Sequence, residues 1–219
     1  MLFRSTRELF DSFLDGSDVA MNCDINRQHK PDAEAYKRQL PAVTWQARFD
    51  GALRKDENAR LSGLFCLDVD IHHEEEFKRR IKHEGVEEAY KWAEQEAKAR
   101  AKQWAAMQRI EDAYPDGTRD LSIVAIHISP SGTGVHVVAV WDELFDTIEQ
   151  QQKSLADKLG TSYDAVCKDR ARIFFLTPRK DWTYIDYQTL FNAMAKKIDR
   201  KSTRLNSSHI GSSRMPSSA

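Results

Sequence analysis

Apolar and polar residues follow one another along this chain in patterns that predict an α+β domain with a mostly antiparallel sheet. Residues 61–70 form a nearly continuous apolar run, which is typical of a central strand. Two further apolar runs, 121–128 and 135–141, are joined by a short connection rich in serine and glycine, and predict two adjacent strands. Weaker patterns over 42–49 and 172–177 predict additional strands. Strands mixed with helical segments in this order indicate the α+β class.

The segments between these runs have helical periodicity. We expect a loop from residue 15 to about 31, and after His72 a short helix that Gly85 separates from a long helix ending near Tyr114. The other expected helices cover residues 6–14, 32–39, 143–159 and 187–198.

The long helix has a narrow, alanine-rich apolar stripe. Apolar residues recur on it every three to four positions, which indicates one buried face. This pattern favours a helix packed across a sheet over a partner-binding coiled coil. The stripe consists of Val86, Tyr90, Ala93, Ala97, Ala101 and Trp104.

The last 21 residues have a different character from the rest of the chain. Residues 199–219 are rich in serine and have no apolar period, and residues 199–209 back-translate in one frame to a common sequencing-library adapter. We therefore expect three parts: an N-terminal extension at 1–35, a domain at 36–198 that is truncated downstream, and an adapter-derived, non-native tail at 199–219.

Net charge and cysteine content narrow the classes of protein to which the chain can belong. Without residues 199–219 the chain has 29 basic and 33 acidic residues, a formal charge of −4. A net negative charge argues against a protein that coats nucleic acid nonspecifically. Any contact with nucleic acid must therefore be made by a local surface patch. Three cysteines without metal-ligand spacing suggest free thiols in a reducing compartment. With no signal peptide and no long apolar span, we expect a cytoplasmic protein without a membrane partner.

The first candidate for chemistry is the run 64–70 (LFCLDVD), which ends with Asp68 and Asp70. In a strand, this spacing points both carboxylates to the same face. Adjacent carboxylates repel each other unless a positive group lies between them, and Mg²⁺ or Mn²⁺ suits hard oxygen ligands. A turn or helix cap is the plain alternative for an isolated Asp-x-Asp. His72 and His73 follow closely and are interpreted as solvated residues rather than ligands.

The second candidate is the hairpin connection 129–136 (SPSGTGVH). Gly132 and Gly134 let the backbone approach a ligand closely and expose N–H groups to an anion. Ser131 and His136 add side-chain donors that suit phosphate. A tight turn with no ligand is the alternative.

The third candidate is the segment 163–172 (YDAVCKDRAR), in which Asp164 precedes a cationic run ending at Arg172. A third carboxylate would complete a two-metal site for phosphoryl transfer. Arg172 could hold a triphosphate through paired hydrogen bonds. A surface charge cluster with Asp164 as a loop cap is the alternative, and Asp169 competes with Asp164 as a ligand.

Together and in this order, the three segments resemble the motifs of archaeo-eukaryotic-type primase-polymerases. The chain is similar in particular to the primase-polymerase-like N-terminal domain that precedes virulence-associated-protein-E-like or other helicase regions in bacterial mobile-element and phage proteins. The resemblance covers residues 36–178 and includes the entry segment 36–44 (YKRQLPAVT), followed by 61–63 (LSG). His136 matches the wider family, whereas many members of the narrower group have a lysine there.

The resemblance implies an RRM-like sheet and template-directed nucleotidyl transfer. Asp68, Asp70 and Asp164 would bind two divalent ions, Mg²⁺ or Mn²⁺. The implied partners are a DNA template and primer, nucleoside triphosphates, and a helicase-type ATPase region beyond residue 198. Template contacts are expected on the basic stretch 78–82 (KRRIK). The residues implied to hold the incoming nucleotide are Ser131, Gly132, Gly134, His136 and Arg172.

Three hypotheses follow for the function. The leading one is a DNA primase or polymerase domain of a mobile-element or phage replication protein. The first alternative is a catalytically inactive nucleic-acid-binding or replication-initiation module of the same fold. The second is a rolling-circle-type endonuclease, which ranks last because His127-Ile128-Ser129 lacks the second histidine of the His-apolar-His metal motif used by those enzymes.

Overall fold

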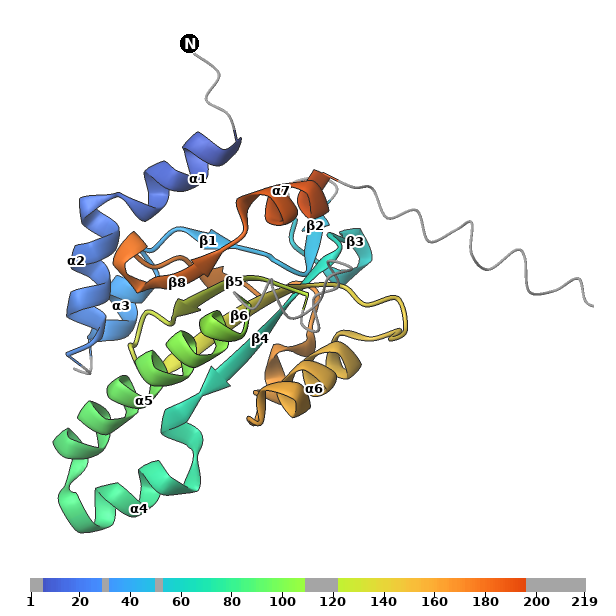
Figure 1. Ribbon diagram of the computed structural model, residues 1–219. Helices are drawn as coiled ribbons and strands as arrows, with labels where there is room; N and C mark the ends of the chain where they lie inside the picture. Colours follow the sequence, from blue (N-terminus) through green and yellow to red (C-terminus); the bar gives the residue numbers. More distant parts are fainter. Residues whose placement is uncertain (1–5, 29–31, 50–52, 109–121, 196–219) are drawn as a thin grey trace, which may run out of the picture.

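A four-stranded antiparallel sheet organises the computed structural model, which describes residues 6–28, 32–49, 53–108 and 122–195 (Figure 1). The hairpin predicted around residues 129–134 is present and places β6 beside β5. Because β6 is antiparallel to both neighbours, β4 and β5 run parallel to each other with β6 inserted between them. In spatial order the strands are β4 (Leu64–Asp70), β6 (Gly134–Val140), β5 (Ile123–Ile128) and β8 (Trp182–Ile185).

Two smaller pairs of strands lie beside this sheet. The first pairs β1 (Ala42–Val43) with β7 (Phe174–Phe175), and the second pairs β2 (Ala47–Phe49) with β3 (Ala59–Leu61). Both pairs are antiparallel. The single strand expected at 42–49 is therefore two short strands with different partners.

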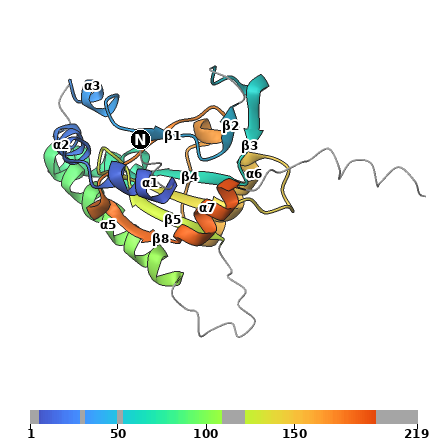
Figure 2. The ribbon, with the colours of Figure 1, turned by 90° about the horizontal axis from the view of Figure 1, so that it is seen from above.

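Helices cover both faces of the main sheet. Figure 1 shows α5 and α6 on one face, with α1, α7 and β1 on the other, and Figure 2 shows α1 and α7 lying over the strands when that face is viewed from above. The helices are α1 (Thr6–Leu14), α2 (Ser17–Asn26), α3 (Ala33–Lys37), α4 (Glu75–Glu84), α5 (Val86–Met107), α6 (Ile148–Leu159) and α7 (Tyr187–Ala195).

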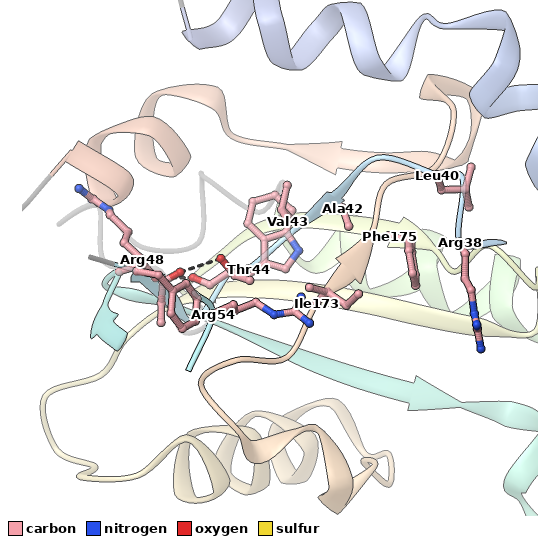
Figure 3. A pocket seen from close by; sticks show the side chains of 13 residues that line it. Arg38, Leu40, Ala42, Val43, Thr44, Arg48, Arg54, Ile173 and Phe175 are labelled. Atoms are coloured by element: carbon pink, nitrogen blue, oxygen red, sulfur yellow. Dashed lines mark hydrogen bonds between the residues drawn. The ribbon is translucent and has the colours of Figure 1, made fainter. Parts of the chain in front are cut away.

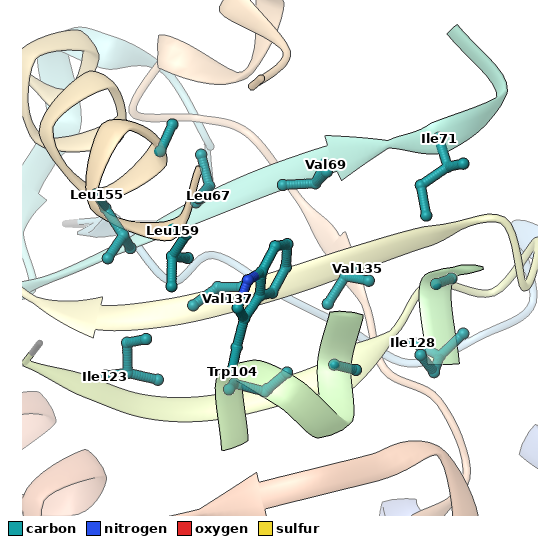
Figure 4. Packing of buried hydrophobic residues seen from close by; sticks show 14 of the residues in the cluster. Leu67, Val69, Ile71, Trp104, Ile123, Ile128, Val135, Val137, Leu155 and Leu159 are labelled. Atoms are coloured by element: carbon teal, nitrogen blue, oxygen red, sulfur yellow. The ribbon is translucent and has the colours of Figure 1, made fainter. Parts of the chain in front are cut away.

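The larger hydrophobic core lies between the sheet and helices α5 and α6. Alternate residues of β4 and β6, including Leu67 and Val137, point into it and meet Trp104 and Leu155 (Figure 4). The alanines of the α5 stripe are fully buried and Tyr90 is partly buried, because small side chains let the helix approach the sheet closely. This confirms the prediction of a helix packed across a sheet. Val86 is an exception, since it is 56% exposed and Ala89 is buried in the stripe instead.

The opposite face of the sheet carries the second core. Leu64 and Cys66 of β4 point to this side and pack with Phe10 of α1, Trp45 and Phe174. Because side chains alternate along a strand, the next residues on the same face of β4 are Asp68 and Asp70. The candidate chemistry therefore begins where this apolar packing ends.

Several sequence predictions differ from the structure in their element boundaries. The loop expected after residue 14 contains α2, whose weak amphipathic pattern hides the helix, although Val19 and Cys23 are buried. The strand expected at 61–70 is broken at Gly63, which has a φ of 90°. Strand β8, which begins directly after the segment 177–181, has no counterpart among the strands that the sequence predicts. The turn at 115–117 and the ends of the long helix and of the last helix lie outside the described residues.

Candidate active site

The strand pair β4–β6 brings the first two candidate segments together. Asp68 lies directly opposite His136, and Asp70 lies opposite Gly134. The Nε2 atom of His136 is 3.4 Å from Oδ1 of Asp68, and both side chains are buried. The β4–β6 pairing thus places the histidine of the second segment against the first carboxylate of the first segment.

The third segment reaches the same carboxylate from a loop that follows α6. The backbone N–H of Asp164 donates to the carbonyl of Asp68 at 3.0 Å, which fixes this loop against β4. The thiol of Cys167 lies 3.3 Å from Oδ2 of Asp68 and 3.4 Å from Oδ2 of Asp164, and can donate to one or the other. We call Asp68, Asp164 and Cys167 the carboxylate cluster, because their ligand atoms all lie within 4.8 Å of one another.

Two buried glutamine side chains position the loop around Cys167. The amide of Gln152 donates to the carbonyls of Cys66 (2.8 Å) and Cys167 (3.1 Å). The amide of Gln46 donates to the same Cys167 carbonyl at 3.0 Å. Because buried amides need partners, these bonds join β4, α6 and the loop after β1 at one point.

Asp164 also has the capping role that the sequence offered as an alternative. Its Oδ1 accepts from the N–H of Val166 at 2.9 Å at the start of a short 3-10 turn, Ala165–Lys168. Asp169, the competing ligand, is exposed and accepts from the N–H of Ala171 at 2.6 Å. The structure therefore puts Asp164, and not Asp169, against Asp68.

Burial dominates the electrostatics of this cluster. It raises the pKa of Asp68, and the neighbouring Asp164 carboxylate adds to the effect while Cys167 and Arg172 oppose it. Burial likewise raises the pKa of Asp70, and the charges of Asp68 and Asp164 add to that shift. Each of these carboxylates is therefore easier to ionise when a cation is near.

Positive charge approaches the cluster from two sides. The charges of Lys37 and Arg172 both act on Asp68 and on His136. Burial, with these two cations, lowers the pKa of His136 to about 3, so its imidazole is neutral at pH 7. Lys37 of α3 was not among the predicted site residues, because its only sequence signal was its place in the entry segment.

Asp70 belongs to a second, neighbouring group. Its two carboxylate oxygens lie 3.8 Å from Nδ1 of His72 and 3.8 Å from Nδ1 of His73. We call these three residues the Asp70 cluster, since their ligand atoms also lie within 4.8 Å of one another. The expectation that both histidines are solvated fits His73, which is exposed, but His72 is half-buried.

Hydroxyl groups of the hairpin connection form a chain of contacts that begins at His72 of the Asp70 cluster. Ser131 bonds to Ser129 at 3.0 Å and to Thr133 at 3.1 Å, and the Thr133 hydroxyl lies 3.3 Å from Nδ1 of His72. Gly132 has a φ of 82°, and a Cβ there would lie 3.3 Å from the side chain of Arg27. Gly134 therefore lies beside Asp70, Ser131 is linked to the Asp70 cluster through the Thr133 hydroxyl, and the turn at Gly132 packs against Arg27.

Arg27 is a second residue that the sequence did not single out. It comes from α2's C-terminal end and forms an ion pair with Asp181 at 2.6 Å, largely out of solvent. Its side chain packs against the Gly132 turn. The pair anchors the second candidate segment to the start of β8.

A separate cleft of about 750 Å³ lies on the other side of β7 (Figure 3). Phe174 points toward His136, with ring centroids 5.4 Å apart, whereas its neighbours Ile173 and Phe175 line this cleft. Among the described residues that line it there are three arginines and no carboxylate. We call it the basic cleft; its arginines are Arg38, Arg48 and Arg54.

The basic stretch predicted to contact a template has a different environment. On α4, Lys78 pairs with Glu75, Arg79 with Glu76, and Arg80 with Glu84, all at 2.6–2.9 Å. These i, i+3 and i, i+4 pairs offset the positive charge of the stretch.

The three candidate segments thus converge, with Asp68 and Asp164 in contact through Cys167, and with Asp70 two residues along the same strand face. No family model, no curated protein and no solved structure matches this chain. Among the described residues, none of the helices combines the length and the apolar character needed to cross a bilayer.

Proposed function

We propose that this chain is a metal-dependent, template-directed nucleotidyltransferase of the DNA primase or polymerase type. The observation that supports this most directly is the contact of Asp68 with Asp164 and with His136. These residues come from three segments remote in sequence, yet they meet on one face of the sheet. The buried carboxylate of Asp68 and the half-buried carboxylate of Asp164, beside a neutral imidazole and two cationic side chains, form a site suited to phosphoryl transfer.

The donor set fits Mg²⁺ or Mn²⁺. Oδ1 of Asp68 is buried and has no hydrogen-bond partner in the described part of the chain, which is the state expected of an oxygen reserved for an ion. Asp68 and Asp164 would hold one ion, and Asp70 would hold a second. When bound, these ions neutralise charge on the phosphates and on the attacking oxygen.

The chain's own residues would position the nucleotide. The hydroxyl of Ser131 and the guanidinium of Arg172 can donate to phosphate oxygens, whereas the N–H of Gly132 already donates to the carbonyl of Ser129 at 2.9 Å. Neutral His136 can donate one N–H without adding a charge. In the reaction, the hydroxyl oxygen of a primer or first nucleotide bonds to the α-phosphorus, the bond to pyrophosphate breaks, and the hydroxyl proton is released to solvent.

The fold and the basic cleft support the rest of the proposal. The order β4, helices, β5, β6 places β6 between the parallel strands β4 and β5, a split β-α-β unit as in an RRM-like sheet, whereas β8 pairs with β5 and not with β4, beside which the fourth strand of an RRM-like sheet lies. The three exposed arginines of the basic cleft suit the phosphates of a template strand. The cleft replaces the α4 stretch as our expected template contact, because Lys78, Arg79 and Arg80 pair with carboxylates at 2.6–2.9 Å, whereas Arg38 of the cleft pairs with the exposed Glu34 only at 3.5 Å.

Primer extension with purified protein, a templated primer, deoxynucleotides and Mn²⁺ tests the proposal. Product is expected from the wild type, and at least about 100-fold less from Asp68→Ala combined with Asp70→Ala. Asp157→Ala, an exposed carboxylate on α6, is the matched control and should leave the product unchanged. No product from the wild type, with DNA binding that ignores metal and nucleotide, would instead favour an inactive nucleic-acid-binding module.

A further inference from the structure

Cys167 gives the carboxylate cluster a sulfur atom, which neither Mg²⁺ nor Mn²⁺ prefers as a ligand. Thiolate ligands select softer ions, and Zn²⁺ accepts both cysteine sulfur and carboxylate oxygen, whereas Mg²⁺ takes oxygen ligands alone. We propose that the carboxylate cluster is a binding site for a thiophilic divalent ion, Zn²⁺ above all, held by Asp68, Asp164 and Cys167.

The distances between the three side chains fit one such ion. Zinc–sulfur and zinc–oxygen bonds of about 2.3 and 2.1 Å at the tetrahedral angle place the two ligand atoms about 3.6 Å apart. The Sγ atom of Cys167 lies 3.3 Å from Oδ2 of Asp68 and 3.4 Å from Oδ2 of Asp164. Small side-chain movements therefore suffice for an ion to bond to all three residues.

A second, independent observation points to a ligand at the same place. Asp68 is only 7% exposed, yet its Oδ1 has no hydrogen-bond partner among the described residues, since Nε2 of the neutral His136 stands 3.4 Å away without forming a hydrogen bond. A buried carboxylate oxygen without a hydrogen bond costs free energy unless a cation satisfies it. Three protein ligands would leave the fourth position to water, as in open zinc sites.

The cysteine is also held in place before any ion binds. Gln46 and Gln152 are both fully buried and donate to the carbonyl of Cys167. Such supporting bonds fix the position of a ligand, and their loss usually weakens metal binding about 10–100-fold. When Zn²⁺ binds, the S–H bond breaks, the proton leaves to solvent and the sulfur bonds to the ion.

The regulatory consequence rests on the proposed function, although the zinc site does not. Zn²⁺ at Asp68 and Asp164 would exclude the Mg²⁺ or Mn²⁺ that nucleotidyl transfer needs. We therefore expect micromolar Zn²⁺ to inhibit extension and a chelator to restore it, with the enzyme's activity following the supply of free zinc.

Titration of the full chain with Cd²⁺ and with Zn²⁺, without nucleotide or DNA, tests the site. Cd²⁺ should produce the ultraviolet charge-transfer band of a thiolate–cadmium bond, and calorimetry should show Zn²⁺ binding. Cys167→Ser should abolish the band and weaken Zn²⁺ binding at least about tenfold, as expected when a ligand is lost. Cys23→Ala, at a buried cysteine in a separate hydrophobic cluster, is the control and should keep both signals.

The band also separates this site from the Asp70 cluster, which offers imidazole and carboxylate but no sulfur. If Cys167→Ser does not fold, Asp164→Asn replaces it and should weaken Zn²⁺ binding while keeping the band. A wild-type chain without the band, or a Cys167→Ser variant that binds Zn²⁺ as tightly as the wild type, overturns the inference. Zinc binding without any primer extension would sink the proposed function and leave the zinc site standing.

Discussion

Gly134 lies directly opposite Asp70 in the β4–β6 pair, and a Cβ at Gly134 would stand 2.9 Å from Oδ1 of Asp70. The same Cβ would lie 3.0 Å from the carbonyl of Val69 and 3.1 Å from Oγ of Ser129. The glycine of the second segment thus makes room for a carboxylate of the first. The need for glycine here comes from space across the sheet, since the positive φ of this turn is at Gly132.

Gly134→Ala should displace the Asp70 carboxylate, because the backbone carbonyl on its other side cannot move away. We expect a loss of about 1–3 kcal/mol in the free energy of unfolding. Primer extension should fall roughly 100-fold, as expected for a misplacement of about 1 Å at a reacting centre. Gly16→Ala, where the nearest atom would be 3.4 Å from the Cβ, is the matched control. Full activity of Gly134→Ala in the same assays contradicts this account.

Asp68→Asn should stabilise the protein at neutral pH without metal. Burial raises the pKa of Asp68, so the folded state keeps a proton that the unfolded chain has already lost. The stability that depends on the protonated carboxyl is present below the unfolded value of about 3.9 and is lost as the pH rises through the folded pKa. Urea unfolding from pH 4 to 8 with a chelator should show Asp68→Asn gaining about 1–3 kcal/mol on the wild type toward neutral pH.

Bound metal should reverse the order of stability, so that the wild type has a higher free energy of unfolding than Asp68→Asn. Mn²⁺ should raise the unfolding free energy of the wild type and leave Asp68→Asn nearly unchanged, since the amide binds cations weakly. Asp157→Asn serves as the control, because its exposed carboxyl should show neither effect. An Asp68→Asn curve parallel to the wild type at every pH would count against a buried, metal-free carboxylate.

Replacing Arg48 and Arg54 together with serine should weaken the binding of single-stranded DNA. Both side chains are exposed in the basic cleft, and Arg48 lies opposite Arg60 across the β2–β3 pair, so a polyanion would relieve like-charge repulsion there. Two lost phosphate contacts should reduce the slope of log affinity against log salt by about 1.4. Fluorescence anisotropy of labelled single-stranded DNA across a series of salt concentrations measures the affinity and its salt slope.

The paired serine substitutions Lys78→Ser and Arg79→Ser, on α4, give the decisive comparison for the template contact. Because those cations already pair with Glu75 and Glu76, we expect little change in DNA affinity or in its salt slope. If the α4 variant loses affinity and the cleft variant does not, the original expectation of a template contact on α4 is the better one.

The sequence predicted the strands that are continuous apolar runs, and it correctly placed the first candidate segment on a strand and the second in a hairpin connection that leads into the next strand. Asp68 and Asp70 share a face because a strand has a period of two, and the register of the β4–β6 pair puts His136 opposite Asp68. Helix α2 escaped prediction because only Val19, Cys23 and two asparagines are buried on it, so no apolar stripe marks its buried side.

Other features of the site depend on tertiary contacts that no local pattern encodes. Cys167 is a free thiol, as the sequence predicted, but no local pattern shows that the loop after α6 turns it toward Asp68, where Gln46 and Gln152 hold its carbonyl. The charge of Lys37 acts on the site from α3, an element remote from the three candidate segments. An ion pair between Arg27 and Asp181, which lie 154 positions apart in sequence, joins α2 to the start of β8.

His136→Asn should flatten the loss of stability in acid. Burial, with the charges of Lys37 and Arg172, lowers the pKa of His136 to about 3, whereas an unfolded histidine titrates near 6.5. The unfolded chain therefore binds the extra proton between these values, and stability falls as the pH drops through this window. Removing the imidazole should reduce the slope of unfolding free energy by up to about 1.4 kcal/mol per pH unit there. The exposed His73, changed to Asn, should leave the slope as it is, and equal slopes for all three proteins would mean that His136 titrates normally.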